Sequence, residues 1–171
     1  FMIAGLLDLH EVSHNQRWLD AAFKLQAALD ENFSDSLGGY FFVAKAHDNL
    51  LARDKPDYDG AIPAGNSIAV LNLMRLNLLT GDSRYETLGR KLLTAFGQTL
   101  LRSGRAMPKM LTGLDFATDK ALQIILVGPK REKMDRTLET VIHQRFLPNR
   151  VVVSVTDDEV EQLSKKISIL E

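Results

Sequence analysis

Apolar residues over the first two-thirds of the chain recur at helical spacings, but they form two kinds of pattern. Trp18, Ala22, Leu25 and Leu29 make a narrow stripe with polar residues between them. In residues 68–79, apolar side chains instead surround nearly the whole helix. A helix that is apolar all round is buried on several sides, whereas a striped helix covers it from outside. The pattern therefore predicts inner helices covered by outer ones.

Two stretches of the chain resemble each other at a fixed offset of 67 residues (84 minus 17, for example). Each stretch predicts an inner helix, a tight turn and an outer helix. Such alternation is typical of an α/α solenoid or a closed α/α toroid, and a simple helical bundle is the alternative. The matching residues are Leu9, Arg17, Trp18, Ala22, Lys24, Leu25, Ala28 and Leu29 in the first stretch and Leu76, Arg84, Tyr85, Gly89, Lys91, Leu92, Ala95 and Phe96 in the second.

Capping residues predict where these helices begin and end. Gly81 suits the left-handed position that ends a helix, and Asn15 suits the cap that begins the first outer helix. Ser83 with Glu86 predicts a capping box for the second outer helix. A further helix is predicted to begin at Pro108. The residues that it should turn inward are Leu111, Leu114 and Ala117.

Two irregular segments separate the hairpins. Residues 37–43, with glycines at 38 and 39, predict a turn into a short strand. Residues 46–65 then form a long loop. Long ordered loops in compact domains are more often functional than merely connecting, so we expect the site in this region.

The end of the chain changes to a mixed pattern. Residues 122–127 predict a buried strand, residues 132–146 a helix and residues 150–155 a second strand. Thr156 and Glu159 then predict a capping box for a last helix. Such a βαβ unit has parallel strands and a right-handed crossover. Two strands make a poor sheet alone, so we expect them to pair with another strand or to pack on the helices.

The predicted fold is mostly α, with the helical hairpins of an incomplete α/α toroid followed by a small βαβ tail. The hairpins occupy residues 1–120, with the long loop at 46–65. The tail and its terminal helix occupy residues 121–171. Two hairpins are too few to close a ring, so the toroid is expected to be incomplete.

The start of the chain predicts that it continues a longer protein. It opens on an apolar run without an initiator Met or a helix cap, and it lacks the basic leader and cleavage site of a signal peptide. Apolar surface exposed at this start should cause self-association or contact with the missing N-terminal part of the same protein. The residues expected to be exposed are Phe1, Ile3, Leu6 and Leu7.

Composition narrows the function classes. The 171 residues are 45% hydrophobic and 25% charged with a formal net charge of −1, so no basic excess indicates nucleic-acid binding. The lack of Cys excludes a disulfide framework, a Cys-based zinc site and a Cys nucleophile. No apolar run approaches membrane-spanning length, so we expect no membrane partner and a cytoplasmic location. Neither G-x-G-x-x-G nor a Walker sequence is present, and we expect no cofactor.

Residues 10–14 read His-Glu-Val-Ser-His, which has the spacing of a zinc-binding H-E-x-x-H motif. On one helix face, His10 and His14 would bind zinc and Glu11 would act as a general base. The internal repeat argues against this role, because His14 matches Gly81 at the end of a helix. No third ligand is evident either. The remaining candidates are Glu31, His47 and His143. We therefore expect a solvated helix end and no metal site.

The stronger candidate site is the loop at residues 57–67. Gly60 and Gly65 permit tight turns in this loop. Asn66 or Ser67 should then cap the inner helix, whose N-terminus offers free N–H groups and the positive end of the helix dipole. The alternative is that the polar side chains only satisfy the backbone of their own loop.

In this hypothesis Asp59 is the catalytic carboxylate, acting as an acid, a base or a group that binds hydroxyls. Asn66 and Ser67 orient the ligand by hydrogen bonds, and Tyr58 supplies an apolar wall with a polar tip. The remaining candidate ligand-binding residues are Asp57, which could partner Asp59, and Arg53 or Lys55, which could hold an anionic group.

Several short motifs of the chain are similar to those of a known family. They are Gly-Gly-Tyr-Phe at 38–41, Tyr-Asp-Gly-Ala at 58–61, Pro-Ala-Gly-Asn-Ser at 63–67 and Thr-Gly-Asp at 80–82. Through them, residues 1–155 resemble the C-terminal part of the spermatogenesis-associated protein 20 family, a group of thioredoxin-domain-containing proteins. The resemblance implies a thioredoxin-like domain, absent from this chain, followed by a toroid of the six-hairpin glycosidase and N-acylglucosamine 2-epimerase type.

That resemblance implies two functional hypotheses. In the first, the toroid processes or binds a carbohydrate-like ligand, and Asp59 pairs with Asp57 or with a carboxylate outside this chain, since acid–base chemistry on sugars needs two carboxyl groups. In the second, the toroid is a non-catalytic interaction module that presents partners to the redox domain. A carboxylate pair that faces the central cavity of the toroid would favour the first hypothesis. An apolar or filled central cavity would favour the second.

Overall fold

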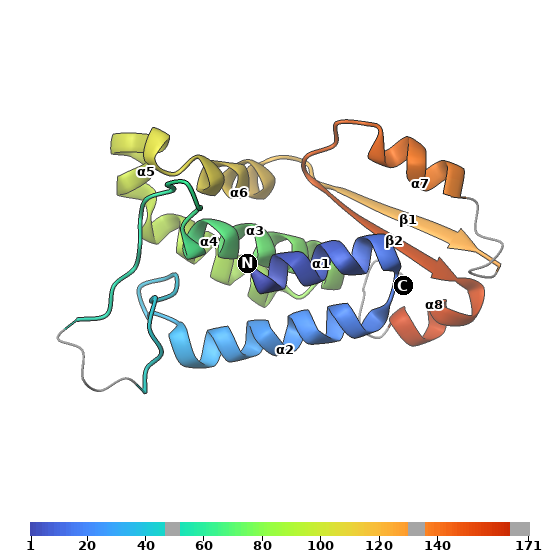
Figure 1. The fold of residues 1–171 in the computed structure, drawn as a ribbon, viewed down its shortest axis with the longest axis horizontal. Coiled ribbons are helices and arrows are strands. Elements are labelled where there is room, and N and C mark those ends of the chain that lie inside the picture. The colour runs from blue at the N-terminus through green and yellow to red at the C-terminus, as the bar shows by residue number, and fades with distance from the viewer. Residues whose placement is uncertain (47–51, 130–135, 165–171) are drawn as a thin grey trace.

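The computed structural model describes residues 1–46, 52–129 and 136–164 of the chain. Within them, helices dominate and two strands form a small sheet (Figure 1), which confirms the mostly-α prediction. The helices are α1 (Met2–Ser13), α2 (Gln16–Phe33), α3 (Gly65–Thr80), α4 (Ser83–Ala95), α5 (Gly97–Ser103), the 3-10 helix η1 (Gly104–Ala106), α6 (Pro108–Thr118), α7 (Arg136–His143) and α8 (Asp157–Ser164), and the strands are β1 (Leu122–Gly128) and β2 (Arg150–Thr156).

Helices α1 and α2 form one hairpin and α3 and α4 form a second, as the repeat predicts. The turns of the two hairpins match at the predicted offset, because His14 has φ 56° and Gly81 has φ 68°, both in the left-handed region. In each turn the backbone N–H donates to a carbonyl four residues earlier, at 2.8 Å to His10 and 2.7 Å to Asn77. The predicted equivalence of the two hairpins is therefore confirmed.

Helix α3 lies at the centre of the molecule and packs against α4 and α6. Val70, Leu73 and Leu76 on α3 are fully buried, as expected for a helix that is apolar all round. The approach of α6 depends on Gly113, because a Cβ there would collide with Cγ1 of Val70. In Figure 1, α1, α3 and α6 all run from left to right, and α3 and α6 begin on the side of the molecule where the α2–α3 connection lies.

The two strands run parallel, with Leu122 opposite Arg150, as predicted. Strand β2 packs on the helices, and its buried valines share a core with Leu7 of α1 and Leu76 of α3. Strand β1 was expected to be buried, and that expectation is wrong: Val127 is 60% exposed and Leu122 is also exposed. The reason is that β2 lies between β1 and the helices, which leaves β1 at the edge.

Several expectations about local detail are also corrected. Asn15 caps α2 as predicted, but Asp82 rather than Ser83 caps α4, because its carboxylate accepts from the N–H of Arg84. Residues 37–43 form no strand; the two glycines turn the chain back so that only an isolated bridge joins Ser34 and Tyr40.

Helix α6 begins at Pro108 as predicted, yet Leu111 is exposed. Met110, Gly113 and Phe116 are buried instead, because they occupy the face that packs on α3. Leu114 and Ala117 are partly buried against the same core.

The start of α1 differs from the sequence-based expectation as well. Ile3, Leu6 and Leu7 are buried, because α2, α3 and β2 cover them. The exposed apolar residues of this segment are Phe1, Met2, Leu9 and Val12. No helix in the described part of the chain is long and apolar enough to cross a membrane.

Candidate functional site

The sequence-predicted site residues lie in the connection between α2 and α3 and in the first turn of α3. The described parts of this connection, residues 34–46 and 52–64, lie on the side of the molecule where α2 ends and α3 and α6 begin (Figure 1), and Pro56 shares a cavity lining with Phe1 and Gly65. The expected location of the loop at the starts of the inner helices is therefore what the structure shows.

Asp59 is buried, and backbone N–H groups engage both of its carboxylate oxygens. Oδ1 accepts from the N–H of Ala64 at 2.7 Å, within the loop. Oδ2 accepts from the N–H groups of Lys109 and Met110 at 2.8 and 3.4 Å, in the first turn of α6. Helix α6 has no side-chain cap from its own N-cap residue, Met107. Asp59 therefore closes its loop and caps a distant helix, where its negative charge is favourable.

Asn66 holds the segment before the loop rather than capping α3. Its Oδ1 accepts from the N–H of Tyr40 and its Nδ2 donates to the carbonyl of Tyr40, both at 2.8 Å. The expected cap is corrected, because α3 begins at Gly65 with Ala64 as its N-cap and no side-chain cap bond. Ser67 is also buried within the first turn, and its Oγ has no hydrogen-bond partner among the described residues.

Tyr40 itself belongs to a buried polar network. Its hydroxyl donates to Oδ1 of Asp30 at 2.5 Å and accepts from Nε2 of Gln26 at 3.0 Å. Burial, and then the hydrogen bond to the Asp30 carboxylate, raise the pKa of Tyr40 far above its ordinary value. The hydroxyl therefore stays protonated and serves as a fixed link between the loop and α2.

The other predicted ligand-binding residues do not meet Asp59 in a common cavity. Asp57 and Tyr58 are exposed. The guanidinium of Arg53 donates to the carbonyl of Val43 at 2.7 and 3.1 Å and lies 4.0 Å from the centre of the Phe41 ring. Of the predicted set, Asn66 lines a cavity described below.

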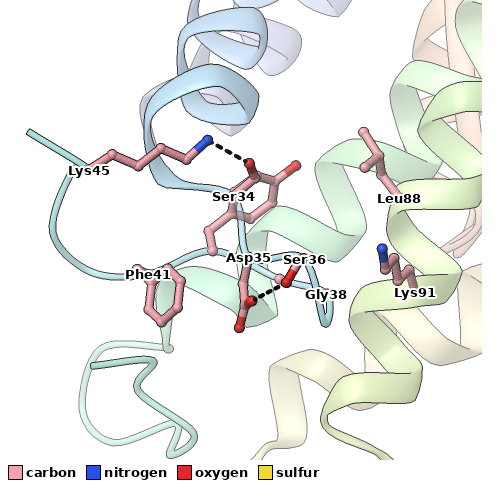
Figure 2. A pocket seen from close by; sticks show the side chains of 10 residues that line it. Ser34, Asp35, Ser36, Gly38, Phe41, Lys45, Leu88 and Lys91 are labelled. Carbon is pink, nitrogen blue, oxygen red and sulfur yellow. Dashed lines mark hydrogen bonds between the residues drawn. The ribbon is translucent and has the colours of Figure 1, made fainter. Parts of the chain in front are cut away.

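A cavity of about 550 Å³ lies between the C-terminal ends of α2 and α4 (Figure 2). Lys45 and Lys91 flank it; Nζ of Lys45 donates to the carbonyl of Glu31 at 2.7 Å and to Oγ of Ser34 at 3.4 Å. The complete lining is Ser34, Asp35, Ser36, Gly38, Gly39, Tyr40, Phe41, Lys45, Leu88 and Lys91.

Asp35 is the carboxylate of this larger cavity, and Nζ of Lys55 donates to its Oδ2 at 2.6 Å. That hydrogen bond is the main cause that lowers the pKa of Asp35, so the Asp35 carboxyl is ionised at neutral pH. The floor is shaped by Gly38, whose φ of 110° is in the left-handed region and whose added Cβ would lie 2.5 Å from the Lys91 carbonyl oxygen. The tight turn against α4 therefore requires glycine.

The sequence pattern does not single out the two lysines of this cavity, because they come from different hairpins. Lys45 follows α2, whereas Lys91 lies on α4. The one local sequence feature that indicated this cavity was the glycine pair at 38 and 39, since two glycines permit the close approach of another backbone segment.

A second cavity, of about 210 Å³, lies among the N-terminal parts of α1 and α3 and the C-terminal part of α2. Its lining is mainly apolar and contains Phe1, Ile3, Leu29, Phe33, Tyr40, Phe41, Phe42, Pro56, Gly65, Asn66, Ile68, Ala69 and Asn72. No carboxylate belongs to this lining. The cavity next to the inner-helix starts is therefore mainly apolar, with Asn66 and Asn72 among its polar side chains.

The H-E-x-x-H residues are engaged in separate contacts. His10 is buried with Nδ1 3.5 Å from the Asn15 carbonyl oxygen, whereas Nε2 of His14 lies 2.8 Å from a Glu139 carboxylate oxygen. Glu11 lies 3.5 Å from the guanidinium of Arg150. Among the described residues, no group of three or more His, Asp or Glu side chains is placed to hold a metal ion.

The chain is similar to several longer proteins. The chain is 35% identical to human and 36% identical to rat spermatogenesis-associated protein 20, in each case over 172 aligned positions that cover 99% of the chain. It is 31% identical over 160 positions to the uncharacterized protein B0495.5 of Caenorhabditis elegans, which covers 93% of the chain. No family model matches. The resemblance predicted from the short motifs is confirmed, and the chain spans 22% of the length of these relatives.

Proposed function

We propose that the chain supplies the last helical hairpins of an α/α toroid in a protein related to spermatogenesis-associated protein 20, and that it acts there as a non-catalytic interaction and scaffold module. In this proposal the preceding hairpin of the toroid covers α1. The relatives are several times longer than this chain, which leaves ample length for preceding hairpins.

The observation that carries the toroid is a difference between two equivalent helix faces. Met2, Leu9 and Val12 on α1 are 70%, 47% and 72% exposed. Their equivalents on α3 at the offset of 67 are Ala69, Leu76 and Leu79, and all three are buried. The face that α3 buries within the chain is thus bare on α1. A preceding hairpin that packs on α1 as the first hairpin packs on α3 would cover this face, because each inner helix of such a repeat lies beside the preceding inner helix.

The non-catalytic role rests on how the carboxylates are used. Asp59 is bonded through both oxygens to backbone N–H groups, and Asp57 is exposed on the same loop. Acid–base chemistry on sugars needs two carboxyl groups about 5–10 Å apart across a bound sugar, and the apolar cavity beside α3 has none. The catalytic role of Asp59 and the cytoplasmic location stay predictions.

The test is Val12→Asp in the protein at its natural length, with Leu101→Asp as the matched control. Both residues are exposed in this structure and lie in the last turns of α1 and α5, so the effect of the helix dipole on the new charge is similar. We expect Val12→Asp to lower the melting temperature by several degrees more than Leu101→Asp, because a buried unpaired charge costs several kcal/mol. Equal melting of the two variants would refute a covered α1 face.

A second candidate function is binding of a carbohydrate-like ligand in the larger cavity. It is favoured by the combination of an aromatic ring at Phe41 with the hydroxyls of Ser34 and Ser36 and two lysines in about 550 Å³. The single lining carboxylate, Asp35, is paired with Lys55, so we infer binding rather than hydrolysis.

The lysines make an anionic sugar the sharpest probe of this second candidate. We expect glucose 6-phosphate to bind more tightly than glucose, and Lys91→Ala to remove that preference. Lys24→Ala is the control, because Lys24 is the exposed repeat equivalent of Lys91 and does not line the cavity. Absence of saturable binding in calorimetry, or equal loss in both variants, would contradict the candidate.

A further inference from the structure

The smaller cavity, between α1, α2 and α3, combines an apolar wall with one unsatisfied polar atom. Phe33, Phe41 and Ile68 contribute to the wall, and the volume is about 210 Å³. Asn72 also lines the cavity and is only 3% exposed. Its side-chain Oδ1 is buried without a hydrogen-bond partner among the described residues. A buried acceptor without a donor costs free energy, so a native structure that keeps one requires an explanation.

Asn72 is also out of place in the pattern of its helix. Helix α3 is apolar nearly all round, and the neighbours of Asn72 on the cavity side are Ile68 and Ala69. The equivalent position on α1 is Gly5, which has open space beside it. The hairpin fold therefore does not require an amide at this position, and packing alone would favour an apolar residue.

We propose that this cavity binds a small, mostly apolar ring molecule that carries one hydrogen-bond donor, of the phenol or indole class, and that Oδ1 of Asn72 accepts the hydrogen bond. A dry cavity of about 150 Å³ lined by apolar side chains is large enough for benzene, so a cavity of this volume holds a ring with a polar substituent. A free sugar is a poor match, because the aromatic wall leaves most of its hydroxyls unpaired. The inference concerns a different cavity from the proposed carbohydrate site and does not depend on the toroid.

Asn66 fixes the shape of this cavity but is not the recognition group. Both ends of its amide are already bonded to the backbone of Tyr40 at 2.8 Å. Asn72 therefore remains the one lining asparagine whose side-chain oxygen has no hydrogen-bond partner among the described residues. The ligand donor should lie within hydrogen-bond distance of that oxygen, with the ring against the phenylalanines.

The experiment compares phenol with fluorobenzene, which has nearly the same size but no donor, by ligand-observed NMR on the protein at its natural length. We expect saturable binding of phenol that is about tenfold tighter than that of fluorobenzene, because only phenol satisfies the buried oxygen. Asn72→Leu keeps the side-chain size and removes the acceptor, so it should abolish the preference for phenol. Asn77→Leu, on the same helix but outside the cavity, is the matched control and should keep the preference.

A second variant guards against misfolding as the cause of lost binding. Ala69→Leu fills the cavity and should weaken both probes, while the thermal melt stays cooperative. Failure of phenol to bind the wild-type protein would overturn the proposal, since water or another segment of the protein would then occupy the cavity. Equal affinity for the two probes, or a preference that survives Asn72→Leu, would overturn it as well.

Discussion

Replacing Asp59 by alanine tests how far the α2–α3 connection depends on one buried carboxylate. Asp59 is 8% exposed and accepts hydrogen bonds from the N–H groups of Ala64, Lys109 and Met110. Loss of a helix cap costs about 0.5–2 kcal/mol, and each buried N–H left unpaired adds about 1 kcal/mol or more. We therefore expect Asp59→Ala to lower the free energy of unfolding by about 3 kcal/mol.

Thermal unfolding followed by circular dichroism measures this effect. A loss of about 3 kcal/mol corresponds to a fall in melting temperature of roughly 6–12 °C for a chain of this size. Asp57→Ala is the control, because Asp57 is exposed on the same loop and should change stability by less than about 0.5 kcal/mol. If the two variants melt at the same temperature, the capping role of Asp59 is refuted.

Asp59→Asn separates capping from catalysis. The amide keeps the shape of the side chain but removes the charge, and it turns one acceptor into a donor that faces a backbone N–H. We expect this variant to lose about 1–2 kcal/mol of stability. An Asp59→Asn protein that melts like the wild type and loses ligand binding would instead support the catalytic role predicted from the sequence.

Four further substitutions, one of them a control, test other parts of the structure. Leu76→Asp should abolish cooperative thermal unfolding, because Leu76 is fully buried between the hairpins; a wild-type-like melt would contradict the core. Lys55 lowers the pKa of Asp35, so this pair stabilises the fold above the ordinary carboxyl pKa and loses its contribution as pH falls through the lowered value. The difference in melting temperature between wild type and Lys55→Met should therefore shrink on acidification, and a constant difference would oppose this. Gly38→Ala should cost about 1–3 kcal/mol in denaturant unfolding, whereas Gly65→Ala, with open space beside it, should cost less.

The helices and their turns could be predicted because the signals are local. The left-handed ends at His14 and Gly81 follow from the repeat, and the cap at Asn15 depends on residues next to it. The capping box of the last helix is supported in the same way, since the Glu159 carboxylate accepts from the N–H of Thr156 at 3.0 Å. Periodicity alone also separated the central helix α3 from the striped helix α2.

The burial predicted from the sequence was wrong where it depends on which distant segment packs against an apolar face. An apolar strand pattern does not say which of two paired strands contacts the helices. The pattern therefore predicted that β1 is buried, whereas the structure buries β2 instead. Likewise, the apolar start of α1 does not say that β2 returns to cover Ile3 and Leu7. Both outcomes depend on contacts between β2 and helices α1 and α3, which precede it by at least 70 residues.

The candidate site shows the same division between local pattern and tertiary contact. The sequence by itself singled out the α2–α3 connection as the candidate site, with Asp59 and Asn66 among its polar residues. Only the tertiary structure decided that Asp59 caps α6 and that Asn66 binds the backbone of Tyr40. It also brought Lys45 and Lys91 to one cavity and left the oxygen of Asn72 without a donor in another. The physical reason is that a side chain can be recognised as polar or apolar from sequence, whereas its hydrogen-bond partners depend on how distant helices pack.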